Sequence, residues 1–194
     1  MLYFEKVIFK LKIKLMKLIK FIIILCVTLS ITSCNDDDNT ILYSLSNENI
    51  VGTYNIGTLN VDTKVTSVTD VSGVSIPFTV ATSTSTGDTF QFIFILNTDG
   101  TYSASGQYRT TATVTPVTGN EVTSSAIISK TNSGTFTLNI EEAKITFTSS
   151  EGNFLMGTYN ILVFNETTLS LNQEKEESAG AITNEIETNI SFIR

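Results

Sequence analysis

Apolar and polar residues alternate along several short segments that are rich in Thr, Ser, Val and Ile. Phe136, Leu138 and Ile140, for example, alternate with polar neighbours, and residues 102–109 and 185–192 show the same pattern. A period of two places each set of side chains on one face of a β-strand, and β-branched residues favour strands. A slip of one residue would move each apolar set into water, so the strand register is well specified.

Turn signals separate these segments at regular intervals. Residues 97–100 (Asn-Thr-Asp-Gly) link two strands as a hairpin, since glycine supplies the positive φ that such a turn needs. Residues 141–142 and 165–167 mark further turns, and residues 115–120 form a longer connection. No helical periodicity occurs from residue 50 to residue 194. The sequence therefore predicts one all-β domain of about eight to ten antiparallel strands, arranged as a barrel or a sandwich.

A short motif recurs four times in this region. Glycine, threonine and an aromatic residue follow one another at 52–54, 100–102, 134–136 and 157–159. We interpret each copy as the opening of a strand after a turn, with the aromatic ring covering the core. A ring of aromatic side chains facing a ligand is the less favoured interpretation.

The N-terminus has the pattern of an export signal. Six lysines lie within the first twenty residues, and an apolar run follows at 21–31. A transmembrane helix needs about 20 predominantly apolar residues, and the lysines interrupt any longer run. Residues 1–33 are therefore predicted to be a helical signal peptide that is removed.

The end of the apolar run defines a cleavage site. Ile31, Thr32, Ser33 and Cys34 resemble the lipobox, in which an aliphatic residue and two small residues precede a cysteine that is acylated. Cys26 follows the bulky Leu25 and fits this pattern poorly. We therefore predict that Cys34 becomes the lipid-bearing N-terminus, and membership of the lipoprotein class implies several acyl chains and stable anchoring. The mature chain would then contain no thiol for a disulfide, a nucleophile or a metal site.

An acidic stretch follows the cysteine, and residues 34–49 are predicted to form a flexible tether because like charges repel and extend a chain. Its first residues are Asn35, Asp36, Asp37 and Asp38. This start resembles that of many Bacteroidetes lipoproteins, in which such acidic residues signal display at the cell surface. The expected location is the outer membrane, lipid-anchored, with the cell surface favoured over the periplasmic face. A solvated spacer without a sorting role is the alternative.

The charge of the mature chain excludes several partners. Removal of residues 1–33 takes six of the twelve basic residues and one of the nineteen acidic residues, which leaves a net charge of −12. Binding to nucleic acid or to an anionic membrane face would require clustered basic residues instead.

Catalytic and metal-binding patterns are not found. The chain contains no histidine, so Ser-His-Asp and Cys-His arrangements cannot form. Residues 141–142, predicted at a turn, and 174–177, predicted in a hydrophilic loop, are best explained as solvated charge. We therefore expect no enzyme, no metal site and no cofactor. Arg109 could meet an anionic ligand at a barrel mouth, but a cross-strand ion pair on the outer face is the favoured prediction.

Several segments, in order, resemble a known family. Residues 50–56 resemble the opening strand of lipocalin-like domains, with Tyr54 at the position of the usual tryptophan. Residues 94–102, 134–138 and 159–171 are similar to the Asn-x-Asp-Gly hairpin, the next core strand and the penultimate hairpin of Bacteroidetes lipocalin-like lipoproteins. The resemblance implies that residues 50–194 form an up-and-down β-barrel or a flattened barrel, but it transfers no binding residues.

Two functions follow as hypotheses. The first is a binding module, in which a barrel of about eight strands encloses a small hydrophobic or amphipathic ligand. The second is a non-catalytic structural or protein-interaction module of the cell envelope. Two observations support it: the long regions 62–88 and 115–130 are predicted to carry loops, and the strand at 90–96 is apolar on both faces. The protein partner is not defined. An apolar interior void above roughly 300 Å³ would favour the first hypothesis, and a packed interior the second.

Overall fold

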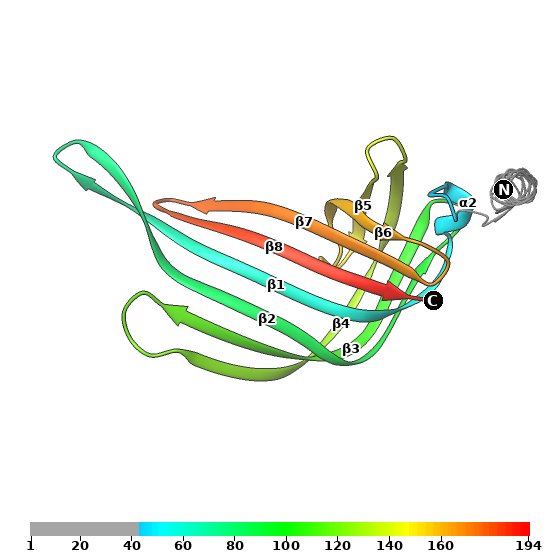
Figure 1. Cartoon of the computed structure of the whole chain (residues 1–194), viewed down its shortest axis with the longest axis horizontal. Helices are drawn as coiled ribbons and strands as arrows, with labels where there is room; N and C mark the ends of the chain where they lie inside the picture. Colours follow the sequence, from blue (N-terminus) through cyan, green and yellow to red (C-terminus); the bar gives the residue numbers. More distant parts are fainter. Residues whose placement is uncertain (1–42) are drawn as a thin grey trace, which may run out of the picture. The chain divides into compact units, whose positions relative to one another are not determined.

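The computed structural model describes residues 43–194, which form eight antiparallel strands and one short helix (Figure 1). The helix is α2 (Asn47–Ile50), and the strands are β1 (Gly52–Val71), β2 (Val74–Leu96), β3 (Thr101–Pro116), β4 (Val122–Asn139), β5 (Lys144–Glu151), β6 (Gly157–Phe164), β7 (Thr168–Ala179) and β8 (Ile182–Ile193). Each strand pairs with the next, and β8 pairs with β1 to close a ring. The predicted all-β, up-and-down, barrel-like fold is confirmed; the predicted signal peptide lies outside the described residues.

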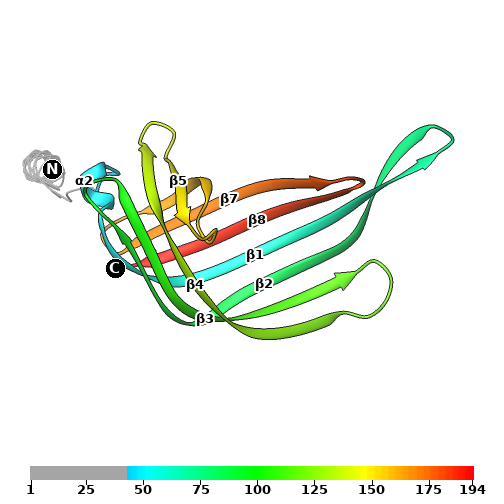
Figure 2. The same ribbon diagram turned by 180° about the vertical axis from the view of Figure 1, so that it is seen from behind.

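The strands differ greatly in length. β1 and β2 contain 20 and 23 residues, whereas β5 and β6 contain 8 each. β5 pairs with β4 only from Ser133 to Asn139, and β6 reaches no farther along β7 than Asn172. The ring is therefore closed at one end only. Beyond it, β4 and β7 are the two edges of an open sheet in the order β4-β3-β2-β1-β8-β7, as Figure 2 shows from behind.

Aromatic side chains fill the closed end of the barrel. Phe94 is fully buried, and its ring centroid lies 4.6 Å from that of Phe192 and 6.1 Å from that of Tyr54. Tyr102 and Phe147 contact the same ring edge-on. Tilted and edge-on aromatic pairs contribute roughly 0.5–1.5 kcal/mol each beyond the burial of their area. The packing of this aromatic cluster stabilises the closed half of the barrel.

A second set of contacts seals the base. The Arg194 guanidinium lies 4.9 Å from the Tyr54 ring centroid and donates hydrogen bonds to the Val51 carbonyl (3.0 Å) and the Tyr54 hydroxyl (2.7 Å). Ser46 caps α2, and Ile50 at its end is fully buried. The folded unit begins at Tyr43, so residues 43–49, which the sequence assigned to the tether, belong to the barrel. Leu45, which packs against the hydrophobic core, holds this segment to the barrel.

The Gly-Thr-aromatic motifs have a structural role, as interpreted. Tyr54, Tyr102, Phe136 and Tyr159 are all buried. The copy at 134–136 does not open a strand, however, but lies within β4. There a Cβ atom on Gly134 would lie 2.0 Å from the Thr148 carbonyl oxygen, so glycine permits the close approach of β5.

The two regions that the sequence predicts to carry loops, 62–88 and 115–130, are largely strands. Residues 62–88 lie in β1, β2 and the tight turn between them, and residues 122–130 lie in β4. Beyond Ser67, β1 has no partner in β8, so Val68–Val80 form a two-stranded ribbon that projects past the other strands (Figure 1). One face of this ribbon carries exposed apolar side chains: Val71, Val74, Ile76 and Phe78. Thr-rich β-hairpins therefore occupy positions that the sequence suggested for loops.

The contrast between the closed end and this ribbon gives a stability prediction on one strand. Phe94 and Phe78 both lie in β2, but Phe94 is 0% exposed and Phe78 is 48% exposed. We expect Phe94→Ala to lower the free energy of unfolding by about 3–5 kcal/mol, since it removes contacts and leaves a cavity. Phe78→Ala should change it by no more than about 0.5 kcal/mol. Urea unfolding followed by circular dichroism measures both, and equal losses would contradict the assignment of the core.

Candidate ligand-binding site

A cavity of about 370 Å³ lies where the ring of strands opens, directly above the aromatic core. Its walls come from β1, β3, β4, β6, β7, β8 and the loop between β5 and β6. The lining residues are Leu59, Val61, Tyr108, Lys130, Asn153, Phe154, Met156, Tyr159, Gln173, Lys175, Glu177, Ile186 and Thr188. The ligand-binding hypothesis required an apolar interior void above roughly 300 Å³. This cavity exceeds that volume, but its lining is about half polar, and the closed half of the barrel is packed with side chains.

Strand phase explains why these side chains converge. Leu59 faces Ile190 across the β1–β8 ladder, and Val61 faces Thr188, so the inner stripe of β1 continues from the core into the cavity. On the partner strand β2, the equivalent inner stripe changes from Phe92 to small residues such as Ser85. Small side chains cannot fill the interior, so the barrel becomes hollow at this level.

The loop between β5 and β6 supplies one wall of the cavity. The Phe154 ring centroid lies 5.0 Å from that of Phe92 and 6.1 Å from that of Tyr108, so Phe154 contacts the core from above. Leu155 beside it is buried. Gly152 fixes the start of the loop with a φ of +75°, and a Cβ there would lie 2.2 Å from the Thr131 carbonyl oxygen. The loop is thus held against β4.

Two lysines give the cavity its polar character. Lys175 forms an ion pair with Glu177 on the same strand, so its charge is balanced locally. Lys130 lies half-buried on β4, and the structure gives its amine no ion-pair partner within residues 43–194. A cavity with apolar side chains in one part of its wall and an unbalanced cation in another suits a ligand with a hydrocarbon part and an acidic group.

Burial changes the acid–base behaviour of the cavity wall. Desolvation raises the pKa of Tyr159 to about 12, and it also raises the pKa of Tyr108. Both phenols therefore stay neutral over the physiological range and act here as polar-tipped apolar surface.

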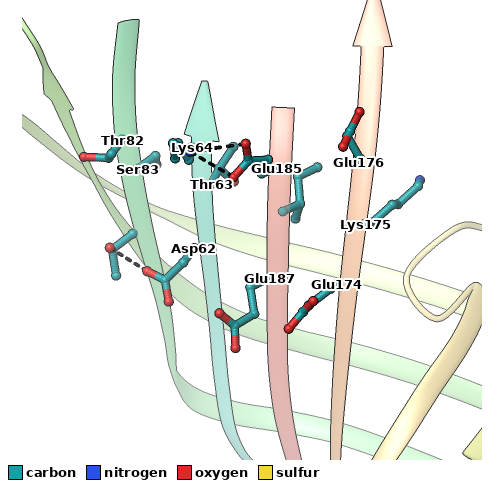
Figure 3. Close-up of a pocket in the computed structure, with 12 residues that line it drawn as sticks. Asp62, Thr63, Lys64, Thr82, Ser83, Glu174, Lys175, Glu176, Glu185 and Glu187 are labelled. Atoms are coloured by element: carbon teal, nitrogen blue, oxygen red, sulfur yellow. Dashed lines mark hydrogen bonds and ion pairs between the residues drawn. The ribbon is translucent and has the colours of Figure 1, made fainter. Parts of the chain in front are cut away.

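A second hollow, of about 590 Å³, lies against β2, β1, β8 and β7 (Figure 3). Asp62 lies opposite Glu187, and Glu187 lies opposite Glu174, so three carboxylates form one row. The next row contains Glu185, Glu176 and Lys64, whose amine lies 3.1 Å from Glu185. Directly opposed like charges destabilise a sheet. The carboxylates are exposed to solvent, and their negative charges do not suit a ligand with an acidic group.

The residues singled out from the sequence fall in different places. Cys34 and the acidic stretch, Asn35, Asp36, Asp37 and Asp38, lie outside the described residues. The ion pair expected for Arg109 is confirmed: its guanidinium contacts Asp88 at 2.8 Å on the outer face, and this contact lowers the pKa of Asp88.

The two acidic clusters differ in outcome. Glu141 and Glu142 lie at a turn, as predicted, and Lys144 lowers the pKa of Glu142 through a hydrogen bond. The loop predicted for residues 174–177 is wrong, because these residues belong to β7. Pairing with β8 holds this charged segment in a strand, with alternate side chains on opposite faces.

Sequence reasoning did not identify Lys130 or Phe154 as lining residues. The phase of β4 contained the signal for Lys130, since even-numbered residues from Phe136 back to Lys130 share one face. For Phe154 the signal was an apolar pair, Phe154 and Leu155, within a stretch of Gly and Asn. Only the folded loop shows that this pair enters the barrel.

Within residues 43–194, no group of three or more Cys, His, Asp or Glu side chains is arranged to hold a metal ion. No helix in this part of the chain combines the length and the hydropathy needed to cross a membrane.

Comparison with known proteins returned no match to any family model, to any curated protein or to any solved structure.

The raised pKa of Tyr159 predicts how stability depends on pH. The unfolded phenol releases its proton near pH 10, whereas the folded one holds it to about pH 12. The unfolded state therefore binds fewer protons between these values, and stability falls as the pH rises through this window. Tyr159→Phe should lose roughly 2–3 kcal/mol less than the parent protein from pH 10 to pH 12. Urea unfolding from pH 8 to pH 12 measures the difference, and parallel curves would contradict the assignment.

Proposed function

We propose that this chain is an outer-membrane lipoprotein, anchored through acylated Cys34, whose barrel binds a small amphipathic molecule with an acidic head. The observation that carries the binding proposal is the cavity between the aromatic core and the open end of the barrel, with Lys130 among its lining residues. It is a binding module rather than an enzyme.

The proposed location rests on the N-terminal sequence. A basic segment, a short apolar run and the residues Ile31, Thr32, Ser33 and Cys34 occur in the order that lipoprotein processing requires. Asp36, Asp37 and Asp38 support display at the cell surface, by resemblance to Bacteroidetes lipoproteins. The lipocalin-like resemblance supports the binding role.

The energetics favour an amphipathic ligand. Each methylene group buried against Leu59, Val61 or Phe154 would contribute about 0.8 kcal/mol. A carboxylate that accepts a hydrogen bond from the Lys130 amine would add about 1.5–3 kcal/mol, since bonds to charged groups exceed neutral ones. At about 30 Å³ for each non-hydrogen atom, the cavity volume of about 370 Å³ admits roughly a dozen such atoms. Decanoate has this size and is a suitable probe.

Replacement of Lys130 tests the role of the acidic head. We expect Lys130→Gln to weaken decanoate binding about ten-fold, because a half-buried, charge-assisted hydrogen bond is lost. Binding of the neutral probe decanol should not change. Lys64→Gln, on the outer face and already paired with Glu185, is the matched control and should bind decanoate normally. Calorimetric titration of the purified parent, Lys130→Gln and Lys64→Gln proteins measures these affinities.

Absence of saturable decanoate binding to the parent protein would contradict the proposed binding function. Equal decanoate affinity of the parent and Lys130→Gln proteins would remove the role of Lys130 and leave only an apolar site.

The anchor is tested separately. Cys34→Ala should release the protein from the membrane fraction and abolish its labelling with palmitate, because no acyl chain remains to bury its methylene groups in the bilayer. Cys26→Ala is the matched control and should fractionate and label like the parent chain. Persistent palmitate labelling of Cys34→Ala would show that another residue is acylated.

A structural or protein-interaction module of the envelope is the second candidate. It is favoured by the projecting ribbon, whose apolar side chains are about half exposed: Val71, Val74, Ile76 and Phe78. Contiguous exposed apolar surface commonly marks an interaction site.

A further inference from the structure

Two strands have unpaired edges where the ring is open. β4 pairs only with β3 over residues 122–130, and β7 pairs only with β8 over residues 173–179. An unpaired edge presents a row of N–H and C=O groups that can accept another strand. The two edges differ in how they are protected.

Charged side chains protect the edge of β7. Four consecutive charged residues occupy its free part: Glu174, Lys175, Glu176 and Glu177. The free part of β4 has one charge, on Lys130, at its end. Its centre carries Ile127, which is 72% exposed, the highest value among the large apolar side chains of the described residues. Arg109, the cross-strand neighbour of Ile127, is neutralised by Asp88. Natural proteins guard edges with charge, so the β4 edge is unguarded.

The backbone groups that point outward can be identified. The Phe136 amide donates to the Gly100 carbonyl at 2.7 Å, so even-numbered residues of β4 direct their polar groups toward β3. The β3–β4 ladder continues without a bulge to Val122. Alternation along a strand therefore directs four other residues toward the open edge: Thr123, Ser125, Ile127 and Ser129.

We propose that the β4 edges of two copies of this chain pair antiparallel about a two-fold axis centred on Ala126. The usable segment is 122–130, because the loop at Gly152 lies against the Thr131 carbonyl oxygen and blocks the edge beyond it. In the register centred on Ala126, every outward donor and acceptor of this segment meets a partner on the second copy. The two open sheets become one continuous sheet.

The side chains are compatible with this register. On the outer face Thr123 meets Ser129, and Ser125 meets Ile127; on the inner face Ser124 meets Ile128. Lys130 meets Val122, so no like charges face each other across the contact. β3 and β4 contain no acidic residue, whereas β7 and β8 are strongly acidic, so self-repulsion of the acidic domain is weakest at this edge.

A disulfide between copies tests the pairing and its register. Ala126 would lie opposite itself in a non-hydrogen-bonded pair, where Cα atoms are about 4.5 Å apart, within the range that a disulfide spans. Ala126→Cys should form a covalent dimer on mild oxidation of the purified protein. Glu176→Cys, on the other open edge, is the matched control, and the parent chain gives the background from Cys26 and Cys34. Dimer formation no greater than in these two proteins would overturn the proposal.

A proline pair tests the backbone contribution. Ser125→Pro removes an outward N–H but no hydrogen bond to β3, and proline is tolerated on edge strands. Glu176→Pro is its equivalent on β7, because the Arg194 amide donates to the Thr167 carbonyl and so places even-numbered residues of β7 on the open side. In sedimentation over rising concentration, Ser125→Pro should lose the dimer that the parent chain and Glu176→Pro form. A monomeric parent chain, or dimers in all three proteins, would overturn the proposal.

Discussion

The eight strands of this barrel differ in length, and the two shortest, β5 and β6, determine where the ring can close. A ring of eight strands closes only over the residues that all eight contribute, and β5 and β6 contribute only eight residues each. The aromatic core occupies this shared level. Everything beyond it follows from the longer strands: the hollow above the core, the two free edges and the projecting ribbon of β1 and β2.

Side-chain size changes at the same level and reinforces the division. Along the inner face of β2, Phe94 and Phe92 lie in the core, whereas Ser85 and Ser83 lie beyond it. The large rings can pack against all parts of a closed ring, while the small hydroxyl side chains suit an open, hydrated surface. Charge also differs around the barrel. β1, β7 and β8 together carry seven acidic side chains, whereas the charged side chains of β3 and β4 are all basic.

Local patterns allowed the strands to be predicted but did not give their lengths. The alternation in 136–140 and the turn at Asn97–Gly100 predicted hairpins, because both depend on neighbouring residues alone. The strand structure of 62–88 escaped prediction, since a Thr-rich stretch is compatible with either a loop or an exposed hairpin. The charged segment of β7 was likewise read as a loop, and only its pairing with β8 explains its conformation. Phe154 enters the barrel through long-range contacts with Phe92 and Tyr108, which no local pattern reports.

The pairing of β8 with β1 also determines when this barrel can acquire its stability. These strands are the first and the last of the folded unit, and their register joins Ile56 with Phe192. A chain that emerges from a ribosome or a translocation channel with its N-terminus first cannot close the ring until Ile193 has followed. Tyr54 and Phe94 lack Phe192 as an aromatic partner until β8 has been made. Contacts between such distant residues slow folding, so closure of the ring is a late step that requires β8.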